Sequence, residues 1–522
     1  MKKNRLLLLP FFVGLVLMIY SWYLSYPLST LSANDFVFNH ISIFYWLSLP
    51  LLLVSMFLMA VTTKSTFLKW ILSIGIVLTF FSLSYFYSMM STLDAQYFRA
   101  LTEYFIKTKS LDPLQSNHYY YSWPAFFVLA DIVTSVSGLT LTNYEFLLFT
   151  LIGFLLPTAL FVYGSKKYTN GGVIMVTAFF ISIMYFMDYQ AVPFTAALML
   201  LFLLFMLETQ QRSIAIMVTE FVLFASLLIT HLFVPLFFVL YLLIRSLFEK
   251  NRQIKTQLRN FFLFALVSYF LTQLTLASFS FQQLIISITK VPVESYSYFF
   301  SVVTSTAAQT SIASTAQFFS RAVTIAAVTI CVAGFILLLI KRKVNAIEKA
   351  LLFAGVLYSA LGQVLNTLGW RALAVAFVPI SLGAAFLFQG KFKPYFAVLF
   401  SVLIVLFLFV PLHTSFNPEL GFQTRENYIA DNFFLNHYNW EKPGFVVSDF
   451  WTNTYLSPKL SVYEYISPTL SKGAKANAIL YPPQLVGVEL GNYSSMQSLS
   501  QGERLDLLYN DGNSYVLISP NH

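Results

Sequence analysis

The sequence predicts an all-α polytopic membrane protein with about 13 transmembrane helices and a small C-terminal extracytoplasmic α/β domain. Three observations predict this class: 58% of the 522 residues are hydrophobic, only 10% are charged, and long apolar segments recur through the first 412 residues. A soluble domain carries about 25% charged residues, so a chain this poor in charge cannot keep a large surface in water. The composition therefore excludes a water-soluble enzyme, a disordered chain and a coiled-coil rod.

The membrane domain is predicted over residues 1–412, because a helix needs roughly 20 apolar residues to cross the hydrocarbon of a bilayer. The N-terminal segment resembles a signal peptide, but its apolar stretch is too long and no small-residue cleavage site follows, so we expect a retained helix. The predicted spans lie near residues 6–25, 41–62, 68–89, 146–163, 172–188, 194–208, 213–230, 232–247, 261–280, 322–340, 350–368, 372–388 and 395–412.

The basic residues give these spans an orientation. With the N-terminus in the cytoplasm and alternating spans, the cytoplasmic segments hold 19 of the 31 basic residues but only 3 of the 22 acids. An excess of Lys and Arg is typical of cytoplasmic loops. We therefore expect a multi-pass cell-membrane protein with a cytoplasmic N-terminus and an extracytoplasmic C-terminal domain. The net charge of +9 follows from this topology, and no nucleic-acid partner is expected.

The long loops fall on the outer face, at about 90–145 and 281–321, and loops of this length between packed helices are usually functional or disordered. In the loop at 90–145, apolar residues at helical spacing over 94–107 predict a helix lying flat at the membrane interface, with Asp94 as its N-cap. Pro124 and Gly138 delimit a second short in-plane helix.

Two interpretations of this loop remain open at this point. Two in-plane helices with an acid at the membrane edge suit a site that meets a lipid head group. Alternatively, Asp94 is only a helix cap, and the aromatic cluster at 119–123 is only an interfacial belt, since Tyr and Trp are common at membrane interfaces.

The single cysteine, Cys331, excludes a disulfide framework and a thiolate metal cluster.

The layout and several short motifs resemble the GT-C-fold glycosyltransferases, and the nearest match is to their prokaryotic, especially archaeal, members. An acid after an early span opens the first external loop, and aromatic residues precede a helix that ends in Ser-Gly-Leu. The motifs that carry the resemblance are Asp94-Ala-Gln-Tyr97, Tyr119-Tyr-Tyr-Ser-Trp123-Pro124, Thr230-His231-Leu-Phe-Val-Pro235 and Gly369-Trp370-Arg371.

The resemblance implies an integral membrane glycosyltransferase that moves a sugar from a polyprenyl-phosphate donor to a protein, lipid or glycan acceptor on the extracytoplasmic face. A general base must reach the acceptor hydroxyl, and Asp94 is the predicted base. Arg371 is the predicted phosphate clamp, because its guanidinium presents a bidentate fork, although snorkelling to the interface is the alternative. The predicted substrate-binding residues are Tyr97, His118, Tyr121, Trp123, His231 and Arg371.

Other acids are weaker candidates. Asp188 is a possible second acid, or else a solvated turn residue, and Glu220 lies deep in a predicted span. Asp94 is followed by Ala95 rather than by a second acid, so no paired-acid motif supports a divalent metal, and we assign no metal ligand and no certain cofactor. The expected partners are a polyprenyl-phosphate-linked sugar and membrane lipid.

Residues 413–522 change composition, because charged residues, Asn, Ser and Pro return. This segment is long enough for a hydrophobic core of its own, which predicts a separate α/β domain. We expect a helix at 425–437, and strands near 444–448, 459–465, 478–481, 485–490 and 514–519.

Two other functions fit the same composition. A lipid or polysaccharide transporter or flippase would also span the membrane many times, but transporters tend to show internal repeats, and none is evident here. A non-catalytic scaffold derived from the GT-C fold, or an inactive member, is the other alternative.

Overall fold

The computed structural model describes residues 2–25, 41–83, 93–111, 119–183, 192–210, 213–278, 281, 311–364, 369–389 and 393–416, together with four short strands between 446 and 518. Within these residues every range predicted as a span holds a helix. These helices are α1 (Lys2–Ser25), α3 (Ile43–Thr62), α4 (Thr66–Phe80), α8 (Leu141–Lys167), α9 (Gly171–Ile183), α10 (Pro193–Glu208), α11 (Ile214–Leu228), α12 (Phe233–Phe248), α13 (Arg252–Thr275), α16 (Ser311–Ile340), α17 (Ala346–Val364), α18 (Gly369–Leu387) and α19 (Lys393–Leu406).

Five of the described helices are long and apolar enough to cross a membrane by length and composition. The described chain is thus mainly helical with membrane spans, as predicted. Several of the other apolar helices have only 10–17 residues, so the number that cross stays a prediction. The five candidates are Leu6–Ser25, Ile43–Thr62, Leu141–Lys167, Phe318–Ile340 and Lys393–Leu412.

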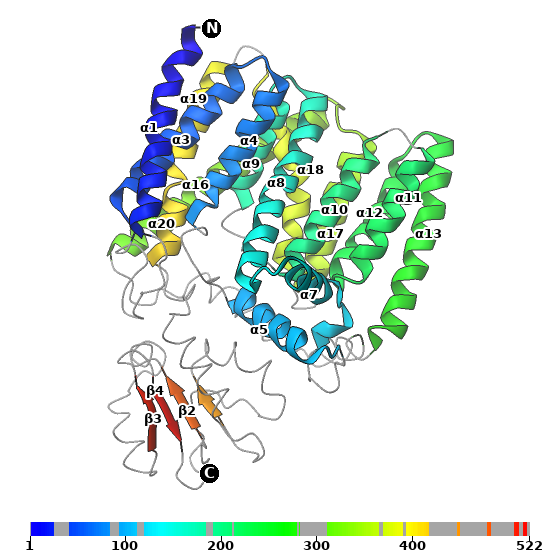
Figure 1. Cartoon of the computed structure of the whole chain (residues 1–522). Coiled ribbons are helices and arrows are strands. Elements are labelled where there is room, and N and C mark those ends of the chain that lie inside the picture. Colours follow the sequence, from blue (N-terminus) through cyan, green and yellow to red (C-terminus); the bar gives the residue numbers. More distant parts are fainter. Residues whose placement is uncertain are drawn as a thin grey trace.

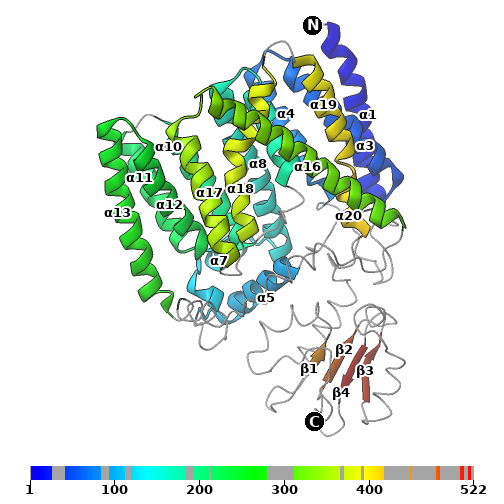
Figure 2. The ribbon, with the colours of Figure 1, turned by 180° about the vertical axis from the view of Figure 1, so that it is seen from behind.

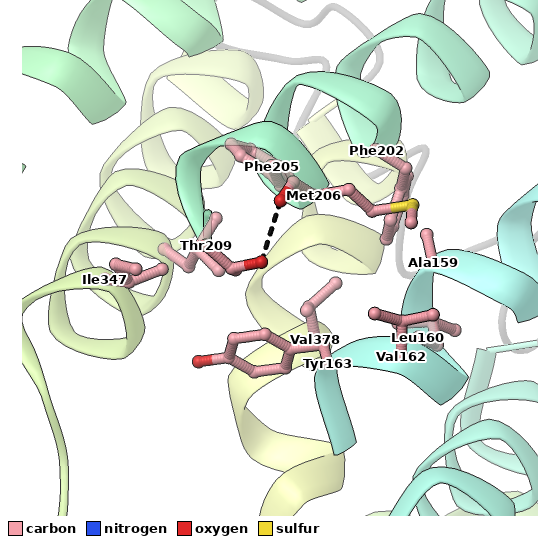
Figure 3. A pocket seen from close by; sticks show the side chains of 11 residues that line it. Ala159, Leu160, Val162, Tyr163, Phe202, Phe205, Met206, Thr209, Ile347 and Val378 are labelled. Carbon is pink, nitrogen blue, oxygen red and sulfur yellow. Dashed lines mark hydrogen bonds between the residues drawn. The ribbon is translucent and has the colours of Figure 1, made fainter. Parts of the chain in front are cut away.

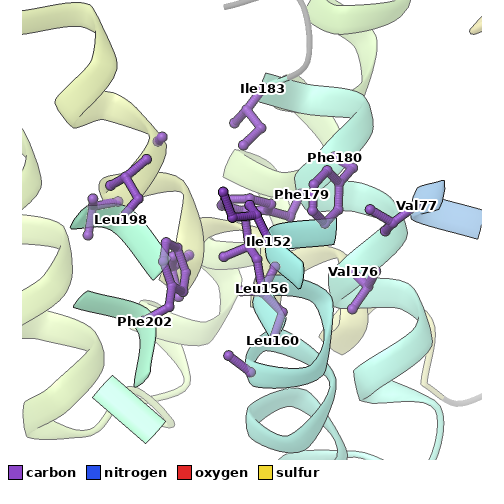
Figure 4. Packing of buried hydrophobic residues seen from close by; sticks show 14 of the residues in the cluster. Val77, Ile152, Leu156, Leu160, Val176, Phe179, Phe180, Ile183, Leu198 and Phe202 are labelled. Carbon is purple, nitrogen blue, oxygen red and sulfur yellow. The ribbon is translucent and has the colours of Figure 1, made fainter. Parts of the chain in front are cut away.

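The core lies where α8, α9 and α10 meet (Figure 4). Every residue of α9 is buried, and its Phe179 and Phe180 pack among Ile152 of α8 and Phe202 of α10. In contrast, α11 and α13 expose large apolar side chains such as Val218 and Val267. An apolar surface of this kind is stable when it faces lipid rather than water.

The helix α16 crosses α18 at a contact between glycines (Figure 2). A Cβ atom on Gly383 would overlap the backbone oxygen of Cys331, and one on Gly334 would overlap the backbone of Gly383. Small residues let helices approach closely in membranes, where burial of apolar surface does not drive helices together. These two glycines therefore permit a close contact between the backbones of α16 and α18, and a larger residue at either position would push the two helices apart.

Two short helices lie across one end of the bundle, opposite the N-terminus (Figure 1). They are α5 (Leu93–Thr108) and α7 (Ala125–Ser137), and the 3-10 turn η2 (Tyr119–Ser122) precedes α7. We call this the α5–α7 end, and the opposite end, where α1 begins, the N-terminal end. Since α5 begins at Leu93, Asp94 lies in its first turn rather than at the predicted N-cap position.

Gly138 ends α7 as predicted. Its φ of 70° lies in the left-handed region that favours glycine, and its N–H donates to the Thr134 oxygen at 3.0 Å. The short helix α20 (Phe409–Phe416) follows α19.

The described part of the tail forms one sheet in the order β1-β2-β4-β3. Its strands β1 (Val446–Ser448) and β2 (Ala478–Tyr481) run parallel, while β4 (Tyr515–Ile518) is antiparallel to β2 and to β3 (Asp506–Asn510). The strand β3 was not predicted, because Asp and Asn at its ends are depleted in strands, and its pairing with β4 outweighs that preference. The predicted helix 425–437 and the strands 459–465 and 485–490 lie outside the described residues.

Candidate functional site

Tyr121 connects η2 to α5 at the α5–α7 end. Only 2% of the residue is exposed, and its hydroxyl donates to the backbone oxygen of Leu101 at 2.7 Å. Its ring packs edge-on against Phe127 of α7, with 5.1 Å between the ring centroids. This hydroxyl is already engaged, so Tyr121 positions η2 between the two short helices.

Trp123 connects the same segment to the transmembrane bundle. Its side chain packs with Leu232 and Ala277, and the N–H of Ala125 donates to the oxygen of Ile229 at 3.0 Å. Ile229 and Leu232 belong to the turn between α11 and α12. The structure thus brings together two segments predicted separately from the sequence, the aromatic cluster and the turn that carries His231.

His231 is buried in that turn. Its Nδ1 accepts a hydrogen bond from the N–H of Phe233 at 3.1 Å, and its ring lies 5.6 Å from that of Phe194. This contact satisfies a backbone N–H at the start of α12, one of the groups that a helix terminus leaves without an intrahelical partner. Nδ1 of His231 is therefore engaged within the turn.

The other predicted site residues lie on several different helices or outside the described residues. Asp94 and Tyr97 lie in the first turns of α5, and Arg371 lies in the first turn of α18. His118 and Asp188 lie outside the described residues. Glu220, on α11, is 1% exposed.

Arg99 holds α5 against α8 through a buried charge cluster that the sequence did not single out. Its guanidinium contacts Glu103 at 3.2 Å, Glu145 at 3.5 Å and the Thr142 hydroxyl at 2.8 Å. The arginine side chain is 11% exposed, and that of Glu145 is 6% exposed. Two features of the sequence could have indicated this cluster. Arg99 and Glu103 have the i, i+4 spacing of a helical ion pair, and Glu145 is an acid next to a predicted span.

A second ion pair joins the end of α5 to α7. The ammonium of Lys109 lies 2.5 Å from the carboxylate of Asp131. The hydrogen bond from Lys109 holds the pKa of Asp131 below its usual value, and a second hydrogen bond, from Ser135, acts in the same direction. The two short helices are therefore joined to each other as well as to the bundle.

Other charged groups pair at the N-terminal end. The buried carboxylate of Glu348 on α17 accepts hydrogen bonds from Tyr163 at 2.9 Å and pairs with Lys167 of α8 at 2.8 Å. Arg245 of α12 forms a buried ion pair with Glu208 of α10.

A pocket with an empty volume of about 370 Å³ lies beside these pairs, between α8, α10, α17 and α18 (Figure 3). Tyr163 and Thr209 supply the polar atoms of a lining that is otherwise apolar. Leu160 of this pocket lies about 22 Å along α8 from Glu145, at 1.5 Å per residue. The pocket therefore belongs to a different region from the α5–α7 end and carries none of the predicted residues.

Among the described residues, no group of three or more His, Cys, Asp or Glu side chains could hold a metal ion. No protein-family model matches the chain, and none of the curated proteins matches it. The resemblance to GT-C-fold enzymes therefore depends on the short motifs and on the layout of the chain.

Proposed function

We propose that this protein is a GT-C-like integral membrane glycosyltransferase. It transfers a sugar from a polyprenyl-phosphate donor to a protein, lipid or glycan acceptor on the extracytoplasmic face, with Asp94 as the general base. The observation that carries the proposal is the arrangement of residues 93–137, where α5 and α7 lie across one end of the bundle with Asp94 in the first turn.

A general base must be held within hydrogen-bond reach of the hydroxyl that it deprotonates. The helix α5 is held at three points: Arg99 contacts α8, Leu101 accepts from Tyr121, and Lys109 pairs with Asp131. A helix fixed in this way presents its first turn at a defined place on the end of the bundle. This rigidity supports a catalytic role for Asp94 over a role in capping alone.

The leaving lipid phosphate needs cationic or hydrogen-bonding groups that stabilise its charge. Arg371 lies in the first turn of α18, where the free N–H groups of the helix also favour an anion. We assign Arg371 to the phosphate, and Tyr97 and Trp123 to the sugar. The donor lipid lies in the bilayer beside the apolar helices.

The test uses the full-length protein in nanodiscs with radiolabelled polyprenyl-phosphate sugars and a membrane extract as acceptor. Asp94→Asn should lower transfer by about 10²–10⁴-fold, the usual contribution of a positioned base. Glu249→Gln is the matched control, because it removes a carboxylate from the C-cap of α12, at the opposite end of the bundle, and it should retain most of the transfer.

Equal transfer by the wild type and by Asp94→Asn would reject the role of Asp94. Protein-dependent movement of the labelled lipid across vesicles, without transfer, would favour the flippase instead.

A further inference from the structure

Among the described residues at the α5–α7 end, several buried polar side chains have no hydrogen-bond partner, and Trp123 and Gln273 are two of them. Trp123 is 3% exposed, and its indole N–H is unpaired. Gln273, in the last turn of α13, is fully buried, and both the oxygen and the nitrogen of its amide are unpaired. Buried polar groups in folded proteins are nearly always hydrogen-bonded, so each of these exceptions calls for an explanation.

The two residues are linked in the fold through Ala277. Trp123 packs with Ala277, which follows the end of α13 and whose N–H donates to the oxygen of Thr272 at 3.1 Å. Gln273 precedes Ala277 by four residues, about 6 Å along a helix axis. Gln273 belongs to the buried face of α13, together with Ala265 and Tyr269, and lies one turn before Ala277.

Nearby polar groups do find partners, so the packing around this end does not prevent hydrogen bonding in general. The hydroxyl of Tyr358 donates to the Phe233 oxygen at 2.8 Å, that of Tyr121 donates to Leu101, and Nδ1 of His231 accepts from Phe233. In the described part of this end, the unpaired polar atoms include the indole N–H of Trp123, both amide atoms of Gln273 and the hydroxyls of Tyr144 and Ser359. Of these, Trp123 and Gln273 are the two linked through Ala277.

We infer that Trp123 and Gln273 form a subsite for a neutral, hydroxyl-bearing group of the ligand, as found on a sugar ring. The indole N–H can only donate, whereas the amide both donates and accepts, which suits hydroxyl groups that do both. The side chains packed around Trp123 are Leu232, Phe233 and Ala277, none of which is charged, so the subsite suits a neutral group.

This inference rests on the proposed function, which supplies the sugar as the ligand. It adds Gln273, a residue far from the other site residues in sequence, and assigns it to the sugar rather than to the phosphate. The bound hydroxyl groups would satisfy atoms that the protein alone leaves unpaired.

The test measures binding of three probes to the full-length protein in nanodiscs. Two bear a sugar, polyprenyl-phosphate mannose and polyprenyl-phosphate glucose, and the third is the same polyprenyl phosphate without sugar. The wild type should bind a sugar-bearing lipid more tightly than the bare one. Gln273→Leu and Trp123→Phe should each weaken binding of the sugar-bearing lipid by about tenfold, the effect of one hydrogen bond, and leave the bare lipid unchanged.

Melting temperature provides the second readout. Gln273→Leu should melt at or above the wild-type temperature, because it replaces an unpaired amide with an apolar side chain of similar size. Trp70→Phe is the matched control, since the Trp70 N–H has a partner, Thr158, at 3.0 Å, and its loss should lower the melting temperature.

A lower melting temperature for Gln273→Leu, or equal binding of sugar-bearing and bare lipids by the wild type, would overturn the subsite. The latter result would mean that the polar atoms hold only water. Failure of the proposed function is a separate result: sugar-dependent binding without any transfer would retain the subsite and reject the glycosyltransferase.

Discussion

The two ends of the bundle treat polar groups differently. At the N-terminal end, ion pairs link neighbouring helices directly, Lys167 with Glu348 and Arg245 with Glu208, and the carboxylates of both pairs are buried. At the α5–α7 end, the ion pairs hold two short surface helices. In the described part of the chain, the side chains of Trp123 and Gln273 have no hydrogen-bond partner, whereas each side chain of the N-terminal pairs has at least one partner.

The difference indicates a division of roles between the ends. A buried charge whose partner is removed is costly, so pairs that connect helices fix their packing. Unpaired buried polar groups reduce stability, so each one calls for an explanation. We therefore interpret the N-terminal end as the fixed part of the bundle, and the α5–α7 end is where we propose that substrate binds.

The largest effect is expected at the N-terminal end. Arg245→Gln leaves the carboxylate of Glu208 buried without its cationic partner, and should lower the free energy of unfolding by about 3–5 kcal/mol. Unfolding by SDS in mixed micelles provides the measurement. The double variant Glu208→Leu with Arg245→Leu should recover much of the loss, because no charge then remains buried. Additive losses in the double variant would argue against this pair as a structural link.

The sequence predicted the helices far better than it predicted these contacts. Long apolar runs identify spans independently of their neighbours, and each predicted range contains a helix in the described residues. The pair of Arg245 and Glu208 depends on how α10 packs near α12, which no local pattern encodes. The sequence does not distinguish Gln273 from other polar residues near the end of a predicted span, and only the packing of the bundle around the end of α13 reveals its burial.

The candidate site was only partly predictable from the sequence, because local signals indicate helices and their ends but not contacts between distant segments. The two short helices and the role of Gly138 follow from local signals, and the structure contains both helices and this glycine at the end of α7. Their orientation relative to the membrane stays a prediction. The contact between the aromatic cluster and the turn at His231 joins residues about 100 positions apart, and it was not predictable. Arg99 was also missed, since its partner Glu145 lies on another helix.

An intermediate effect is expected where α5 meets α8. Arg99→Gln removes charge-assisted contacts to Glu103 and Glu145. A hydrogen bond to a charged group contributes about 1.5–3 kcal/mol to stability, so this variant should loosen α5 without unfolding the bundle. Hydrogen exchange of the α5 amides should accelerate, while that of the buried α9 stays slow. Arg99→Lys keeps the positive charge but not the guanidinium fork. Its α5 amides should therefore exchange faster than those of the wild type and more slowly than those of Arg99→Gln. Unchanged exchange in α5 would show that Arg99 does not hold this helix.

The smallest effect is expected from Lys109 and Asp131, because the lysine side chain is 57% exposed and exposed pairs contribute about 0.2–1 kcal/mol. The pKa of Asp131 in the folded protein lies below its ordinary value of 3.8. The pair therefore contributes stability above that ordinary value and loses it as the pH falls through the lower folded value.

Lys109→Gln should accordingly lower the melting temperature slightly at pH 7, where the carboxylate is charged, and the difference from the wild type should shrink as the pH falls below the ordinary pKa of Asp131. High salt at pH 7 should reduce the difference as well, since solvent screens an exposed pair. A difference that persists at low pH and in high salt would mean that Lys109 stabilises the end of α5 through its backbone, where its φ is 57° and its N–H donates to the Phe105 oxygen, rather than through its charge.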